Sequence, residues 1–324
     1  MGTGMTDIVC REWYLNGLKA GKDHLAAVME MTWLVLEHNG FPLFSSPKSK
    51  RTFSDRCKIG MLVLKELLDV SYRMLSRLLT SMPGVLEAGG TAKVPEQSTL
   101  RKFAARLDSR VLEEAVAETA RLICGPGVIL AVDATGFSES NASRHYVKRM
   151  KQMGAVETTV RDYAKVTLAG DVSSKAVASC VVSTSLTSDV KLFVPVLEKA
   201  KGTGIDVECV LGDKGYDSEA LHEEGRRIFG SDTDIWIPPR KSEPLSIKSA
   251  GKHRPGGKYR KNAYENIGGS PYNLRCQIET VNSMIKRTTG DVVYGKSMMS
   301  IEKEILCTVL VHNLKLLLDS GLVR

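Results

Sequence analysis

Residues 127–135 read GVILAVDAT, an apolar run that leads directly into an acidic residue, Asp133. The same pattern returns at residues 207–213, where VECVLGD ends in Asp213. Short apolar runs bounded by glycine and polar residues are typical of buried strands. The sequence therefore predicts two strands that each carry a carboxylate at the end, and these strands decide the fold.

The elements around these two strands follow from the same patterns. Apolar runs predict further strands around residues 166–169, 175–186 and 233–239. Helices are predicted at residues 190–204 and from Ser218 onward. Three strands, then helix, strand, helix, strand and terminal helices, is the element order of an RNase H-like fold. We expect an α/β fold with a mixed sheet flanked by helices.

The short apolar, strand-like runs begin only after residue 124, and the sequence before it predicts an all-helical N-terminal region. Ser54 and Ser98 are candidate N-caps, and Asn39-Gly40 is a candidate C-terminus for the first helix. The helices are predicted within residues 7–44, from Ser54, within 71–84 and over 98–123. We expect domains at residues 1–123 and 124–324.

The N-terminal helices fit two interpretations. Two short helices, a break and then a basic helix are compatible with a helix-turn-helix DNA reader. In that arrangement Arg101, Lys102 and Arg106 would face phosphates or bases. An ordinary helical bundle with solvated basic side chains fits the same sequence, so the pattern leaves both open.

Composition favours a polyanionic partner. The 324-residue chain has a net charge of +8 and a pI of about 9.0, which indicates nucleic acid first. Its seven cysteines are scattered without metal-ligand spacing, as expected of reduced cytosolic thiols. The N-terminus lacks a signal-peptide pattern, and no run is long and apolar enough for a membrane span. We expect a cytoplasmic protein that acts on DNA.

Four residues near the C-terminus share one regular spacing. Tyr272, Arg275, Glu279 and Lys286 are separated by steps of three, four and seven residues. In a helix such positions lie on one face. That face would carry a phenol, a guanidinium, a carboxylate and an ammonium group.

Two strand-end carboxylates and a helical one suit a divalent-metal site for phosphodiester chemistry. Two Mg²⁺ (or Mn²⁺) ions about 4 Å apart activate a nucleophile and stabilise the leaving oxygen. Asp133 would bridge both ions, while Asp213 and Glu279 would each hold one. Structural alternatives exist for each carboxylate: both aspartates could cap turns, and Glu279 could pair with Arg275.

These residues resemble the DDE triad and the Y-x2-R-x3-E-x6-K signature of insertion-sequence transposases. The resemblance spans roughly residues 128–318, with GVILAVDAT, VLGDKGYDS, IPPRK and LVHNLKLLL in the family's order. It implies that Asp133, Asp213 and Glu279 are catalytic metal ligands. It further implies that Tyr272, Arg275 and Lys286 contact phosphate near the cut.

A basic segment separates the fifth predicted strand from this signature. Residues 240–261 hold eight Lys or Arg and one acidic residue, with several prolines and glycines. We expect a flexible loop that follows a phosphate backbone, although a merely solvated loop is the alternative. The DNA contacts expected here are Arg240, Lys241, Lys258, Arg260 and Lys261. The insert, at about 238–270, is too short for the large β-rich domain of some relatives.

The expected function is a transposase that binds element ends, cleaves them and joins 3′-OH ends to target DNA. Because two ends must be brought together, a homodimer on double-stranded DNA is expected. Two alternatives remain: a nuclease without strand transfer, and a catalytically silent DNA-binding protein derived from a transposase. The intact carboxylates argue against the silent protein, because carboxylates are costly to bury without a role.

Overall fold

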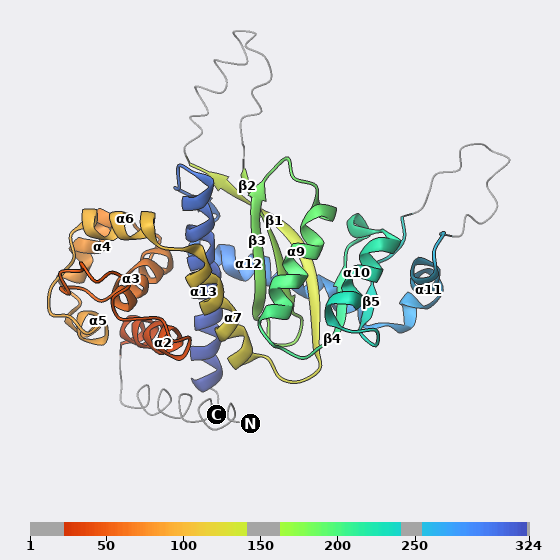
Figure 1. Cartoon of the computed structure of the whole chain (residues 1–324), viewed down its shortest axis with the longest axis horizontal. Coiled ribbons are helices and arrows are strands. Elements are labelled where there is room, and N and C mark those ends of the chain that lie inside the picture. Colours follow the sequence, from red (N-terminus) through yellow and green to blue (C-terminus); the bar gives the residue numbers. More distant parts are fainter. Residues whose placement is uncertain (1–22, 141–162, 241–254, 323–324) are drawn as a thin grey trace, which may run out of the picture. The chain divides into compact units, whose positions relative to one another are not determined.

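A computed structural model describes residues 23–140, 163–240 and 255–322 of the chain (Figure 1). The chain divides into two compact units, and each is described by itself. The helical unit comprises residues 1–123 and 285–324, and the sheet unit comprises residues 124–284. The chain passes from one unit to the other between residues 123 and 124, and residues 285–324 group with the N-terminal helices.

The described part of the helical unit is built around its C-terminal helix. Helix α13, Met298–Leu322, packs on α7, α3 and α2 of the N-terminal region. Buried apolar side chains such as Leu310 and Leu314 on α13 and Leu112 and Val116 on α7 form this core. The elements of this unit are α2 (His24–His38), α3 (Asp55–Leu67), α4 (Tyr72–Leu79), α5 (Pro83–Ala88), α6 (Gln97–Arg106), α7 (Ser109–Ile123), β6 (Val292–Val293) and α13.

Two details of these helices differ from the prediction. The helix expected over residues 98–123 is two helices, α6 and α7, because Leu107 adopts an extended ψ of 131°. The Asp108 carboxylate accepts a hydrogen bond from the Arg110 backbone N–H at 3.1 Å, which competes with continued helix. Ser98 is not the N-cap, since α6 begins at Gln97 after Glu96.

Other helix ends agree with the sequence prediction. Ser54 caps α3, because its hydroxyl accepts a hydrogen bond from the Cys57 N–H at 3.0 Å. Helix α2 ends at His38 with Asn39 as its C-cap, as predicted. The part of the first predicted helix before residue 23 lies outside the described residues.

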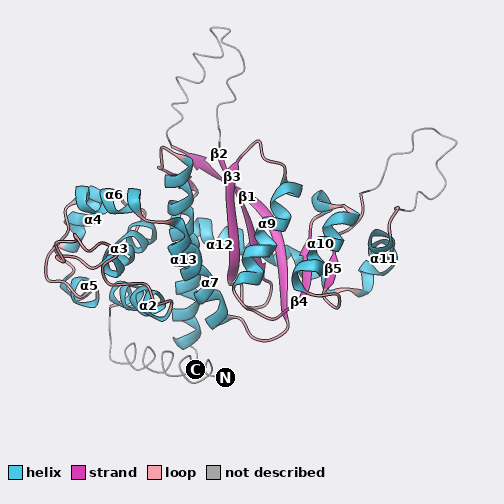
Figure 2. Ribbon diagram, in the orientation of Figure 1, coloured by secondary structure: helices cyan, strands magenta, loops and turns pink. Residues whose placement is uncertain are grey.

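The sheet unit contains the predicted mixed sheet, with strands in the order β3-β2-β1-β4-β5 (Figure 2). The β1–β2 and β2–β3 pairs are antiparallel, whereas β1–β4 and β4–β5 are parallel. The described elements are β1 (Val128–Glu139), β2 (Tyr163–Asp171), β3 (Val177–Thr184), α9 (Asp189–Gly202), β4 (Val207–Gly212), η1 (Lys214–Tyr216), α10 (Glu219–Phe229), β5 (Asp234–Trp236), α11 (Lys258–Asn266), η3 (Ile267–Gly269), η4 (Pro271–Cys276) and the start of α12 (Gln277–Thr289).

Helices approach both faces of this sheet. Helix α9 packs on β2 and β3, and the Ser179 hydroxyl donates a hydrogen bond to the Val196 carbonyl at 2.7 Å. Ile278 at the start of α12 lies against Gly170 of β2 so closely that a Cβ there would come within 2.9 Å. Side chains alternate between the faces of a strand, and Ser179 pairs with Ala169, the neighbour of Gly170. The α9 and α12 contacts therefore lie on opposite faces.

None of the helices in the described ranges is long and apolar enough to cross a membrane.

A buried histidine makes the stability of the sheet unit depend on pH. His222 on α10 is fully buried, and its ring stacks on Tyr259 with centroids 6.4 Å apart. Burial, with the nearby positive charge of Arg226, lowers the His222 pKa from 6.5 to about 4. The unfolded chain then binds a proton more readily than the folded chain at mildly acidic pH.

We therefore expect the stability supplied by neutral His222 to be complete above pH 6.5 and to be lost as the pH falls toward 4. Urea unfolding of the wild type should show an extra loss of about 2 kcal/mol between pH 7 and pH 5, relative to His222→Phe. Phenylalanine keeps the stacked ring but has no site to protonate. Parallel losses in the two proteins would contradict this assignment.

Candidate active site

The two aspartates predicted at strand ends belong to neighbouring parallel strands, but only Asp213 follows its strand, because β1 runs on past Asp133 to Glu139. Val132 of β1 pairs with Gly212 of β4, and each is followed by its aspartate, Asp133 and Asp213. Beyond this point β1 no longer pairs with β4, and the chain after β4 turns into η1. The predicted pair of carboxylates therefore lies at one place in the sheet, where β1 and β4 stop pairing.

Arg275 joins two of the three predicted catalytic carboxylates. Its Nη1 lies 3.7 Å from Asp133 Oδ1, and its Nη2 forms an ion pair with Glu279 Oε1. The side chain of Asp133 is 23% exposed and that of Glu279 is 59% exposed. The guanidinium thus connects a sheltered carboxylate of the sheet with an open one on α12.

Electrostatics couple all three carboxylates. Burial raises the pKa of Asp133, and the positive charge of Arg275 partly offsets that rise. The negative charges of Glu279 and Asp213 raise the Asp133 pKa further. The charge of the three carboxylates is therefore only partly compensated by Arg275, and a bound cation would be stabilised here.

Asn282 belongs to this site, although its place in the sequence does not predict this. Its Nδ2 donates a hydrogen bond to Asp133 Oδ2 at 3.1 Å, and its Oδ1 is buried with no hydrogen-bond partner among the described residues. It follows Glu279 by three residues on α12, so the two share a helix face. That spacing was the available signal, but an asparagine at such a position is common in helices of every kind.

The structural alternatives considered for two carboxylates are also present. Asp213 caps η1 by accepting a hydrogen bond from the Lys214 N–H at 2.6 Å, and Glu279 is paired with Arg275. Over the described ranges, no three His, Cys, Asp or Glu side chains are arranged as a ready-made metal cage. Mg²⁺ needs only one or two carboxylates beside water and substrate oxygens, so the donor chemistry of Asp133, Asp213 and Glu279 fits it.

The four signature residues do not share one α-helix. Tyr272 and Arg275 lie in the 3-10 helix η4, whereas Glu279 and Lys286 lie in α12. Pro271 occupies the first turn of η4, and the Ser270 hydroxyl accepts from the Tyr272 N–H at 3.3 Å. Arg275 and Glu279 still form an ion pair, although they lie in different helical elements. Partial burial raises the pKa of the Tyr272 phenol.

Lys286 follows Glu279 by seven residues, about 10 Å along the axis of α12.

The basic segment is partly helical, which corrects the expected loop. Lys258, Arg260 and Lys261 lie at the start of α11, and only the two lysines are exposed. The Arg260 guanidinium donates to both oxygens of Asp217, at 2.6 and 2.7 Å. Residues 241–254, and with them Lys241, lie outside the described residues.

Arg240 also contacts protein rather than solvent alone. Its guanidinium donates to the backbone carbonyls of Lys214 and Gly215, at 3.0 and 2.6 Å. In the helical unit, Arg101 and Lys102 are exposed on α6.

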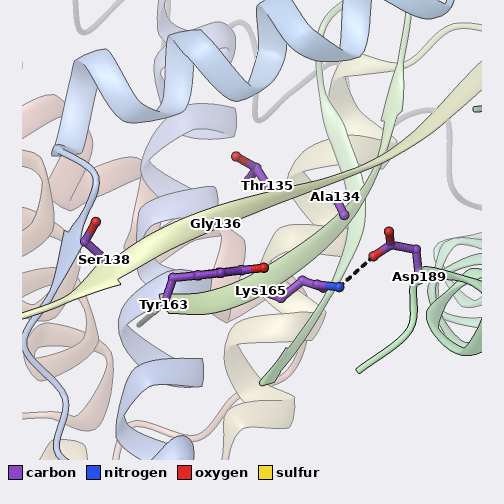
Figure 3. A pocket seen from close by; sticks show the side chains of 7 residues that line it. All are labelled: Ala134, Thr135, Gly136, Ser138, Tyr163, Lys165 and Asp189. Atoms are coloured by element: carbon purple, nitrogen blue, oxygen red, sulfur yellow. Dashed lines mark hydrogen bonds and ion pairs between the residues drawn. The ribbon is translucent and has the colours of Figure 1, made fainter. Parts of the chain in front are cut away.

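A pocket of about 490 Å³ opens beside the part of β1 that follows Asp133. Gly136, Tyr163 and Lys165 line it, and the Lys165 ammonium lies 2.9 Å from the Asp189 carboxylate (Figure 3). Gly136 pairs with Lys165 in the β1–β2 register, and it faces away from Asp133 because side chains alternate along a strand. These three residues thus lie on the opposite face from Asp133, and the pocket is largely separate from the carboxylates.

Residues 125–314 match the family described as "Transposase DDE domain". The match covers more than half of the 324 residues, so the chain belongs to this family and is a protein of the transposase class. A solved structure titled "Cryo-EM structure of piggyBac transposase synaptic complex with hairpin DNA (SNHP)" is similar at 9% identity with a TM-score of 0.44. That similarity covers 97% of this chain and 75% of the other. No curated protein sequence matches the chain.

The position of Arg275 between two carboxylates predicts that lysine cannot replace it. A lysine keeps the charge but loses the planar set of donors that reaches both Asp133 and Glu279. We expect Arg275→Lys to cut DNA-end cleavage at least about tenfold, equal to roughly 1.4 kcal/mol of transition-state stabilisation.

Its melting temperature should stay nearly unchanged, because an ion pair with so exposed a partner adds little stability. Arg287→Lys, an exposed arginine on the same helix, is the matched control. Near-normal cleavage by Arg275→Lys would reduce Arg275 to a simple i,i+4 partner of Glu279.

Proposed function

We propose that this protein is an insertion-sequence transposase of the kind that carries the Y-x2-R-x3-E-x6-K signature. Asp133, Asp213 and Glu279 would form its catalytic triad. The observation that carries this proposal is the arrangement at Asp133. Arg275 bridges Asp133 to Glu279, and the parallel register places Asp213 beside it.

The three carboxylates would hold two divalent cations, Mg²⁺ or Mn²⁺, which supply charge neutralisation and activation of a water or 3′-OH nucleophile. Asp133 is more sheltered than Glu279 and is held from two sides, by Arg275 and by Asn282. Glu279 is exposed, so the site is accessible to a substrate as large as duplex DNA. Arg275 then has a second use, because a guanidinium binds phosphate with the same two donors that it offers to carboxylates.

Double-stranded DNA, both element ends and target, is the proposed substrate. Tyr272, Arg275 and Lys286 would contact phosphate near the cut. Lys258 and Lys261 on α11, and Arg101 and Lys102 on α6, would be additional phosphate contacts. The net charge of +8 supports such a partner. Because transposition brings two ends together, we propose that the protein acts as a homodimer on DNA.

In domain terms, residues 1–123 would bind DNA and residues 124–324 would form the catalytic part. The family match over residues 125–314 supports this division of the sequence. Helix α13 would then belong to the catalytic part in sequence while it packs on the N-terminal helices.

The triad is tested by neutral variants of similar shape. Asp133→Asn, Asp213→Asn and Glu279→Gln should each abolish metal-dependent nicking of a plasmid with element ends. DNA affinity should stay within about threefold, because phosphate contacts dominate it. Asp232→Asn, on an exposed turn, is the control that should keep full activity.

Retained nicking in any triad variant would remove that residue from the triad. The joining step is tested separately with pre-cleaved ends that carry a free 3′-OH. Cleavage without joining would identify a nuclease that does not transfer strands. Absence of metal-dependent nicking in the wild type would leave a DNA-binding protein without catalysis.

The exposed lysines of α11 predict a measurable salt dependence. The double variant Lys258→Ala with Lys261→Ala should flatten the slope of log affinity against log salt by up to about two units, one for each lost phosphate contact. The control is Lys191→Ala, an exposed lysine on α9. An unchanged slope in the double variant would show that the start of α11 is solvated and does not contact DNA.

A further inference from the structure

Asp217 is a buried carboxylate whose hydrogen bonds come from two distant parts of the chain. Its side chain is 2% exposed. It accepts from Arg260 Nε at 2.6 Å, from Arg260 Nη2 at 2.7 Å and from the Arg240 backbone N–H at 2.8 Å. Three donors on one buried carboxylate fix its position closely, and the paired guanidinium balances its charge.

The two arginines flank the basic segment that begins at Arg240 and ends at α11. The Arg240 guanidinium donates to the carbonyls of Lys214 and Gly215, so it holds the same turn that Asp217 ends. Glu219, two residues after Asp217, accepts from the backbone N–H groups of Tyr259 and Arg260, at 2.9 and 3.0 Å. Both ends of the segment are thereby tied to residues 214–219.

That turn starts at Asp213. The Asp213 side chain caps η1 through the Lys214 N–H, and Asp217 closes η1 at its other end. Between them Tyr216 is buried, with its ring 5.0 Å from that of Phe193. A shift at Asp217 would therefore be passed to Asp213 along one short turn whose middle is anchored in the core.

We propose that Asp217 is a positioning residue that, with Arg240 and Arg260, links both ends of the basic segment to the turn carrying Asp213. Arg260 in this role is an internal partner of Asp217 and not a phosphate contact. The link would couple DNA bound by the segment to the metal-binding position of Asp213. This inference rests on the proposed function, which makes Asp213 a metal ligand.

The variants Asp217→Asn and Arg260→Met, with their double variant, test the proposal at a temperature where all are folded. Asparagine keeps the shape of Asp217 but removes its charge, and methionine keeps part of the stem of Arg260. Each single variant should lower the cleavage rate and weaken Mn²⁺ binding without DNA, measured by electron paramagnetic resonance, by about tenfold, as loss of an outer-shell partner does.

The double variant should lose no more cleavage rate or Mn²⁺ affinity than the more impaired of the two single variants, because both changes break the same link. The slope of log DNA affinity against log salt should stay within about half a unit of the wild-type slope in Arg260→Met, since no phosphate contact is lost. Arg227→Met is the control: this exposed arginine on α10 pairs with Glu224 and Glu198, so Mn²⁺ binding and cleavage should stay normal.

Three results would overturn the proposal. A salt slope lowered by about one unit in Arg260→Met would make Arg260 a phosphate contact. Additive losses in the double variant would show that the residues act separately, and normal Mn²⁺ binding in both single variants would remove the link to Asp213. If Asp217→Asn does not fold, Arg260→Lys takes its place, since it keeps the charge but lacks the paired donors.

Failure of the proposed function gives a different result. In that case the wild type itself shows no metal-dependent cleavage, and Asp213→Asn does not change Mn²⁺ binding. A wild type that cleaves, beside Asp217 variants that bind Mn²⁺ normally, rejects only the role given to Asp217.

Discussion

The site of the sheet unit is built around one partly buried carboxylate, Asp133, that lies near two other acids. Burial raises the pKa of Asp133, and the negative charges of Glu279 and Asp213 add to that rise, so a positive charge beside Asp133 stabilises its ionised form. Arg275 supplies that charge in the protein alone, through contacts with Asp133 and Glu279. In the proposed function a divalent cation would supply more of it, and the guanidinium would then be able to bind a phosphate.

The sheet unit is arranged so that these groups have little freedom. The parallel register of β1 with β4 fixes the two aspartates, and close contact of Ile278 with Gly170 fixes the start of α12 against β2. Gly212 has a related role: a Cβ there would come within 3.0 Å of Ile237, so the backbone before Asp213 is tightly enclosed. Packing on three sides therefore positions acids that electrostatics alone would drive apart.

Long basic segments next to an active site are usually read as DNA contacts, but the four described basic residues of this segment differ in their surroundings. Arg240 and Arg260 donate to carbonyls and to a buried carboxylate, while Lys258 and Lys261 are exposed. Arginine suits the first role because its planar donors match a carboxylate, and lysine suits a solvated phosphate contact. Among these four residues, arginine or lysine identity therefore separates side chains that donate hydrogen bonds within the protein from the exposed lysines, which a count of charges does not do.

Apolar periodicity was enough to predict every described strand of the sheet unit and Asp213 at the end of β4, because burial imposes that pattern locally. It did not predict that β1 continues past Asp133 to Glu139. The spacing of Arg275 and Glu279 offered their ion pair as an alternative to a catalytic Glu279, and the structure contains that ion pair. Only the tertiary structure decided the break between α6 and α7, the bond from Asn282 to Asp133, and the link from Asp217 to Arg240 and Arg260. The two links join residues far apart in sequence, and the break depends on local side-chain hydrogen bonds that compete with a helical pattern. Hydrophobic periodicity records neither kind of interaction.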